Sequence, residues 1–169
     1  MKKTQPAKMD ITCTASEGEK VIQVTRVQWR MDMTNDRLET GQPIQILTLI
    51  DMVTKQSPAV EIQKTFTRQD VVSLLDRLAP REKLTLCHDN GLHFLSKDLK
   101  YWAQHNNVKL VQPPVGELNQ QRTIDVFIRK LKVECLDDLN STSIEEAQQS
   151  VDQWRTRYNA IRSDGGSQK

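Results

Sequence analysis

The period of the hydrophobic pattern changes near Thr67, and this change constrains the fold more than any other feature of the sequence. Over residues 27–34 apolar and polar residues alternate, as in a strand with one apolar and one polar face. Further apolar runs over 44–50 and 57–62, with turn residues between them, predict two more strands and an antiparallel meander. Pro58 places the third strand at an edge, or begins it.

After Thr67 the pattern alternates between helical and extended segments. Thr67 and Ser96 are suitable N-caps, and Pro80 ends the first helix. The expected elements are helix 68–79, strand 84–87, helix 97–106, strand 108–111 and helices 120–135 and 143–159. This order predicts an α/β fold and resembles that of the ribonuclease H-like fold. Its mixed five-stranded sheet has three antiparallel strands, then two parallel ones, and is flanked by helices.

The length and composition fit one globular domain. The chain has 169 residues, of which 37% are hydrophobic and 27% charged. We expect a polar lead-in over 1–20, a folded core over 21–162 and a flexible tail over 163–169. Because the formal net charge is only +2, any contact with nucleic acid must come from a local basic face.

Three cysteines lie far apart and form no CxxC pair, so neither a disulfide framework nor a zinc ribbon is indicated. His93 and His105 have no cysteine at ligand spacing, which argues against zinc. No apolar run approaches the roughly 20 residues of a membrane span, and none follows the basic N-terminus as in a signal peptide. We therefore expect a cytoplasmic protein without a membrane partner.

Three aspartates occupy positions from which they can converge. Asp32 lies on the polar face of the first strand, Asp89 follows the fourth strand, and Asp125 is near the start of the long helix. Carboxylates are the ligands that Mg²⁺ prefers. Two of them also have a structural explanation: Asp89 before Asn90-Gly91 suits a turn, and Asp125 complements the helix dipole. Asp32 is harder to explain structurally, since aspartate is depleted in strands.

Five motifs, in order over residues 26–162, resemble the integrase core of insertion-sequence transposases and retroviral integrases. They are Trp29-Arg30-Met31-Asp32-Met33-Thr34 (W-x-x-D-x-T), His88-Asp89-Asn90-Gly91 (S-D-N-G), Asp125 after a spacing of thirty-five residues, Phe127 to Leu136 (F-x-x-x-L-K-x-E-x-L) and Trp154 to Arg162 (W-x-x-x-Y-N-x-x-R). The resemblance implies a ribonuclease H-like domain that cleaves and joins DNA strands.

The same resemblance implies a site and its partners. Asp32, Asp89 and Asp125 would be catalytic and would hold two Mg²⁺ or Mn²⁺ ions. The partners would be the DNA of the element ends and of the target, further copies of the chain in a homodimer or larger oligomer, and a separate DNA-binding module or subunit. His88, Asn90 and Glu134 are possible supporting residues, Glu134 also as an ion-pair partner.

The chain departs from the family at two places. Asp125 stands where the family has glutamate, and is shorter by one methylene, roughly 1.5 Å of reach. The loop before it, 114–122, lacks the usual P-G-x-P-x-D-N-A pattern, and Glu117 in this loop is a less favoured substitute ligand. These departures leave two alternatives open: a catalytically impaired remnant that binds DNA or a transposase partner without cutting, and a ribonuclease H-like nuclease that cleaves without joining.

One face of the long helix is basic. Arg122, Arg129 and Lys132 share a side with Asp125, whereas the apolar residues fall on the opposite side, and Lys130 lies between the two. Basic residues around a metal ligand suit contacts with DNA phosphates. A solvated charged face is the structural alternative.

Overall fold

The structure is a computed structural model that describes residues 27–80, 83–89, 91, 96–112, 118–137 and 140–164. The predicted lead-in, Asn90, His93 and Glu117 lie outside these ranges, as does the tail from residue 165. Within them, no helix has both the length and the apolar character that crossing a membrane requires.

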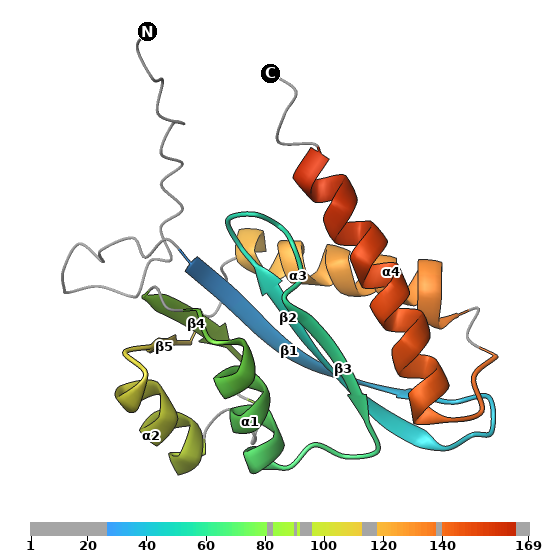
Figure 1. The fold of residues 1–169 in the computed structure, drawn as a ribbon, viewed down its shortest axis with the longest axis horizontal. Helices are drawn as coiled ribbons and strands as arrows, with labels where there is room; N and C mark the ends of the chain where they lie inside the picture. The colour runs from blue at the N-terminus through green and yellow to red at the C-terminus, as the bar shows by residue number, and fades with distance from the viewer. Residues whose placement is uncertain are drawn as a thin grey trace, which may run out of the picture.

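The five strands form one mixed sheet, as predicted (Figure 1). Its order is β3-β2-β1-β4-β5, so that β1 is central and β3 is an edge strand. The first three strands pair antiparallel, and β4 and β5 join them in parallel. The strands are β1 (Val27–Arg37), β2 (Pro43–Asp51), β3 (Ala59–Gln63), β4 (Leu84–His88) and β5 (Lys109–Val111).

Helices cover both faces of the sheet (Figure 1). On one face α1 (Arg68–Leu78) and α2 (Lys97–His105) pack over a core that includes Trp29, Leu75 and Trp102. On the other, α3 (Leu118–Leu131) and α4 (Ile144–Asp164) cover a second core. The predicted caps are confirmed, since the side chains of Thr67 and Ser96 accept hydrogen bonds from the backbone of α1 and α2.

The polar face of β1 is buried by α3. Alternation along the strand sends Trp29 and Met31 toward α1 and α2, and Arg30 and Asp32 toward the other helices. Arg30 is only 3% exposed and Asp32 is half-buried. The polar residues of β1 thus lie beneath a helix, where an unpartnered charge is costly.

The C-terminal helices differ from the prediction in their bounds. The helix predicted over 120–135 ends at Leu131 and continues as a π-helical segment, η1 (Lys132–Leu136), in which Asp137 N donates to Lys132 O at 2.8 Å. The last helix reaches Asp164 and not residue 159, because no helix-breaking residue occurs before the Gly165-Gly166 pair.

Polar side chains of α4 bind the exposed edge of β3 and the residues before it. The Gln148 side chain accepts from Ile62 N at 2.7 Å and donates to Val60 O at 2.9 Å. Asn159 pairs with both backbone groups of Ser57, at 2.8 and 2.9 Å. These amides satisfy backbone groups that a sixth strand would otherwise pair with.

An aromatic cluster fixes α3 to α4. Phe127 makes edge contacts with Trp154 and Tyr158, with ring centroids 5.4 and 4.9 Å apart, and is 1% exposed. We expect Phe127→Ala to lower the free energy of unfolding by about 3–5 kcal/mol, because it opens a cavity in the core under α3. Urea denaturation measures this loss. The neighbouring Val126→Ala, at a position 47% exposed, should change stability by less than about 0.5 kcal/mol; equal losses in both variants would contradict the assignment.

Candidate active site

The parallel pairing of β1 with β4 brings two of the three aspartates together. The last residue pair between these strands is Met31 with His88, so Asp32 and Asp89 each lie one residue beyond it. Neighbouring strands are about 4.8 Å apart. The Asp89 carboxylate also accepts a hydrogen bond from Gly91 N at 2.8 Å, so the predicted turn chemistry is present at this position.

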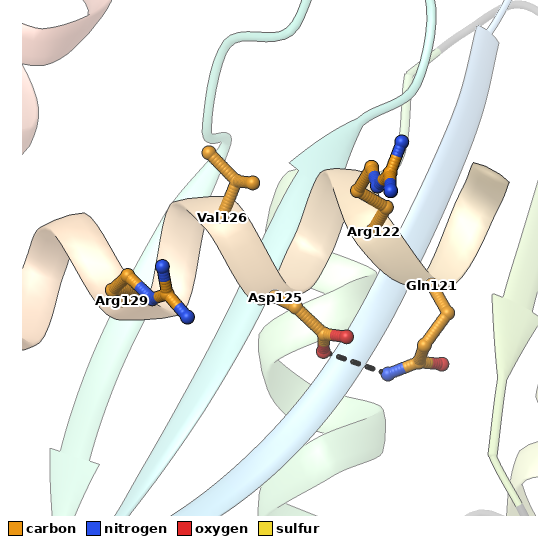
Figure 2. Close-up of a pocket in the computed structure, with 5 residues that line it drawn as sticks. All are labelled: Gln121, Arg122, Asp125, Val126 and Arg129. Carbon is orange, nitrogen blue, oxygen red and sulfur yellow. Dashed lines mark hydrogen bonds between the residues drawn. The ribbon is translucent and has the colours of Figure 1, made fainter. Parts of the chain in front are cut away.

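The third aspartate is on α3, which crosses this region. Asp125 Oδ1 accepts a hydrogen bond of 2.8 Å from Gln121 Nε2, one helical turn earlier. Figure 2 shows both side chains projecting from the same side of α3, whereas Val126 projects from the other. Gln121 Oε1 in turn accepts from the buried guanidinium of Arg30. A hydrogen-bonded relay, Arg30–Gln121–Asp125, therefore connects β1 to α3.

The charges of the other two carboxylates both act on Asp32. Burial is the largest cause that raises the pKa of Asp32, which reaches about 6, and the negative charges of Asp89 and Asp125 raise it further. The hydrogen bond from Met33 N, 2.9 Å long, and the positive charge of Arg30 oppose this shift. The fold thus concentrates negative charge at the end of β4.

A buried hydroxyl adds an oxygen beside these carboxylates. Thr48 lies opposite Asp32 in the antiparallel register of β1 and β2, so both side chains are on the same face. Thr48 is 1% exposed, and its Oγ1 has no hydrogen-bond partner among the described residues. A buried hydroxyl without a partner is costly, and water or a ligand at this place would satisfy it.

The donor set fits a hard divalent cation by its chemistry, since it consists of carboxylate and hydroxyl oxygens. The arrangement is not yet that of a metal site. Within the described residues, no three acidic, histidine or cysteine side chains lie close enough together to hold an ion. The hydrogen bond from Gln121 to Asp125 is the contact that such an ion would have to compete with.

The structure describes two of the predicted supporting residues, His88 and Glu134. His88 is buried and, by strand alternation, faces away from Asp32; its Nδ1 contacts Asp89 O at 2.7 Å. Glu134 is nine residues beyond Asp125, about 13 Å along the helix. It accepts from Trp154 Nε1 at 3.0 Å and pairs with Lys130 at 3.8 Å, as expected of an ion-pair partner.

The predicted basic face of α3 is exposed, and the apolar face is buried. Arg122, Asp125 and Arg129 line a hollow of about 380 Å³ together with Gln121 and Val126 (Figure 2). Of the three aspartates, Asp125 is the one that lines this hollow. Lys130 and Lys132 are also exposed.

Sequence reasoning missed three residues of this region: Arg30, Thr48 and Gln121. Arg30 had a signal, since it shares the polar face of its strand with Asp32. Thr48 and Gln121 had none, because the register of β2 and the position of α3 come from tertiary packing.

The charge at Asp32 destabilises the fold at neutral pH. Because its folded-state pKa is raised above the ordinary value, the folded chain takes up a proton between about pH 6 and pH 4 before the unfolded chain does. We expect Asp32→Asn, which retains an acceptor for Met33 N, to raise stability by about 1–2 kcal/mol at pH 7.5, after discounting for solvent screening.

This gain should shrink toward pH 4, where the native aspartate is protonated, and thermal melts from pH 4 to 8 measure it. Asp36→Asn, on the same strand and face, is the matched control and should change little. A constant difference between Asp32→Asn and the native chain across this range would contradict the assignment.

Residues 106–166 match the family model described as "Integrase core domain". An uncharacterised 39.2 kDa protein of insertion element IS476 from Xanthomonas euvesicatoria is 32% identical over 139 residues, which are 79% of this chain and 39% of that protein. An uncharacterised 31.7 kDa protein of insertion element IS407 from Burkholderia multivorans is 30% identical over 139 residues, 79% of this chain and 49% of that protein. The chain thus spans less than half the length of these relatives.

Two solved structures share the fold. The HTLV-2 integrase catalytic core domain in complex with magnesium superposes with a TM-score of 0.52 at 18% identity, over 73% of this chain and 80% of that one. The Mos1 transposase catalytic domain, solved with raltegravir and Mg, gives 0.59 at 13% identity, over 76% and 70%. The likeness confirms the ribonuclease H-like fold. The family match over residues 106–166 and the insertion-element relatives show that this chain is similar to integrase core domains and to proteins of insertion elements.

Proposed function

We propose that this domain is the catalytic core of a DNA transposase or integrase, and that it cleaves and transfers DNA strands by metal-dependent phosphoryl transfer. The observation that carries the proposal is the position of Asp32 and Asp89 one residue beyond the last β1–β4 pair, together with the negative charges of Asp89 and Asp125 acting on Asp32. Concentrated negative charge in a partly buried place lowers stability, and catalytic sites are where proteins retain such groups.

The three aspartates would hold the divalent ions, and Thr48 would bind water beside them. When bound, two Mg²⁺ or Mn²⁺ ions supply the activation of water or a DNA 3′-hydroxyl and stabilise the leaving oxygen. The chain's own part is to present ionised oxygens. With a pKa of about 6, Asp32 is mostly ionised at neutral pH, whereas below pH 6 its proton competes with a cation.

The relay through Gln121 bears on the shortened third carboxylate. The amide of Gln121 restricts the rotamers of Asp125, and Arg30 restricts Gln121. Because Asp125 reaches less far than the glutamate of the family, its side chain has less freedom to find a ligand position. Gln121 and Arg30 are thus positioning residues that aim Asp125 toward β1.

DNA and further copies of the chain are the proposed partners. Arg122, Arg129, Lys130 and Lys132 are exposed around or beyond the hollow that contains Asp125, as contacts with DNA phosphates require. The HTLV-2 integrase core was solved in dimeric and trimeric forms, which supports an oligomer here. A separate DNA-binding module or subunit fits the short span of the relatives that this chain covers.

One observation favours the alternative of a catalytically impaired domain that binds DNA or a transposase partner without cutting. Asp125 is occupied by Gln121, and the described acidic side chains do not form a ready metal site. A ribonuclease H-like nuclease would be distinguished by its products, which would be cleaved and not joined.

Asp89→Asn is expected to lower strand cleavage and strand transfer at least about 100-fold, because it removes a charged ligand but retains the acceptor for Gly91 N. The assay uses DNA with the element's end sequence and Mg²⁺ or Mn²⁺, and separates cleaved from joined products. Asp36→Asn should retain full activity. Full activity in Asp89→Asn would overturn the proposal.

The role of Asp125 as the third metal ligand is tested by lengthening its side chain. We expect Asp125→Glu to bind Mn²⁺ several-fold more tightly than the native chain, because the added methylene extends the carboxylate toward Asp32. Titration of free Mn²⁺ by electron paramagnetic resonance measures this. Asp152→Glu, on exposed α4, is the control. If neither the native chain nor Asp125→Glu binds Mn²⁺ while both bind DNA, the non-cutting alternative is correct.

A further inference from the structure

A second hollow, of about 630 Å³, lies between the turn after β2, the end of α3 with η1, and the C-terminal half of α4. We call it the α4 groove and define it by Lys55, Lys130, Glu134, Arg157, Tyr158 and Arg162. Figure 1 shows the C-terminal half of α4 beside the turn between β2 and β3. None of the predicted catalytic residues lines it.

The groove has a strong excess of positive charge. Four of its residues are cationic and only Glu134 is acidic, although the whole chain has a formal net charge of +2. Among the ion pairs of the described residues, only Lys130–Glu134, at 3.8 Å, belongs to the groove. Lys55, Arg157 and Arg162 therefore face the same space without an acidic partner at ion-pair distance in the described part of the chain.

Holding these cations close together is electrostatically unfavourable. Lys55 has a left-handed backbone, with φ 61°, and its N–H donates to Asp51 O at 2.9 Å in the turn. Burial lowers the pKa of Lys55, and the charge of Arg162 lowers it further, against the opposing effect of Asp51. The Arg162 guanidinium lies 5.1 Å from the centroid of the Tyr158 ring. Positive groups arranged this way gain most from a bound anion.

The groove suits a phosphate better than a base. Two aromatic side chains line it, Trp154 and Tyr158. They are 4% and 8% exposed, and their rings pack on each other and on Phe127. They offer no free ring face on which a nucleotide base could stack. Beside Thr54 and the exposed Ile161, the groove offers guanidinium and ammonium groups, which bind phosphate oxygens without reading sequence.

The groove and the hollow that contains Asp125 are both bordered by α3. Arg129 lines the hollow beside Asp125, and the next residue, Lys130, lines the α4 groove. From Asp125 to Lys130 the rise along the helix is about 7.5 Å, and the side chain turns by roughly 140° around the axis. A duplex that crosses α3 from the carboxylates would bring phosphates on its path to Lys130.

We propose that the α4 groove binds the phosphodiester backbone of DNA next to the reacting phosphate. The choice of DNA as the anion rests on the proposed function; the need for an anion rests on the charges of the groove. The groove holds the duplex in register and contributes affinity without sequence preference.

The test is the triple variant Lys55→Gln/Arg157→Gln/Arg162→Gln, with binding of a short duplex DNA measured by fluorescence anisotropy over a series of salt concentrations. We expect its affinity to fall about tenfold or more near 0.1 M salt, and the slope of log K against log salt to decrease by about 2–3, one counterion for each lost phosphate contact. Circular dichroism and thermal melts check that the variant folds.

The matched control is Arg68→Gln/Lys97→Gln/Lys109→Gln, which removes the same charge from exposed positions on α1, α2 and β5. The proposal is overturned if the salt slope of the groove variant is unchanged, or if the groove and control variants lose equal affinity for DNA. Strand cleavage and strand transfer by the native chain, measured separately, distinguish this outcome from a failure of the catalytic proposal. If the native chain binds no DNA, both the proposed role of the α4 groove and the proposal that DNA is a partner are wrong.

Discussion

The parallel hydrogen bonding between β1 and β4 is the constraint from which the rest of the site follows. It joins two segments separated by more than fifty residues and fixes their register at Met31 and His88. With this register, alternation places Asp32 and Asp89 beside each other, beyond the last residue pair. A shift by one residue would turn one carboxylate toward α1 and α2. The chemistry of the domain therefore depends on a backbone pairing, and the side chains follow from it.

The position of α3 depends on two kinds of contact with opposite character. Phe127 and its aromatic partners hold the helix by apolar burial, which is insensitive to its rotation by small angles. The relay from Arg30 to Gln121 is directional and fixes which side of the helix faces β1. Burial supplies most of the stability of this layer, and the hydrogen bonds orient the face that carries Asp125.

Much of the fold was predictable from local pattern. The alternation over 27–34, the caps Thr67 and Ser96, and the position of Pro58 before an edge strand each encode an element or its limit. The sequence predicted the polar face of β1 but not the burial of that face under α3. How a helix packs on a sheet depends on both segments together and cannot be predicted from the pattern of either one. The π-helical segment had no sequence signal for the same reason.

For the candidate site, the sequence predicts which aspartates take part but not the contacts between them. Spacing and resemblance predict the three aspartates, and in the structure the charges of Asp89 and Asp125 both raise the pKa of Asp32. What joins them came from the structure: Thr48 through the register of β2, and Gln121 through the contact of α3 with Arg30. The motif from Trp154 to Arg162 resembles a functional signature, yet its first residues pack in the core and Asn159 binds the backbone of Ser57.

The side chain of Gln148 has a consequence for how copies of this domain can associate. By donating to Val60 O and accepting from Ile62 N, it imitates one peptide unit of a neighbouring strand. An incoming chain could extend the sheet at β3 only by displacing this amide together with α4. This edge is thereby closed to intermolecular strand addition, so association by strand pairing would have to use the other edge of the sheet, β5.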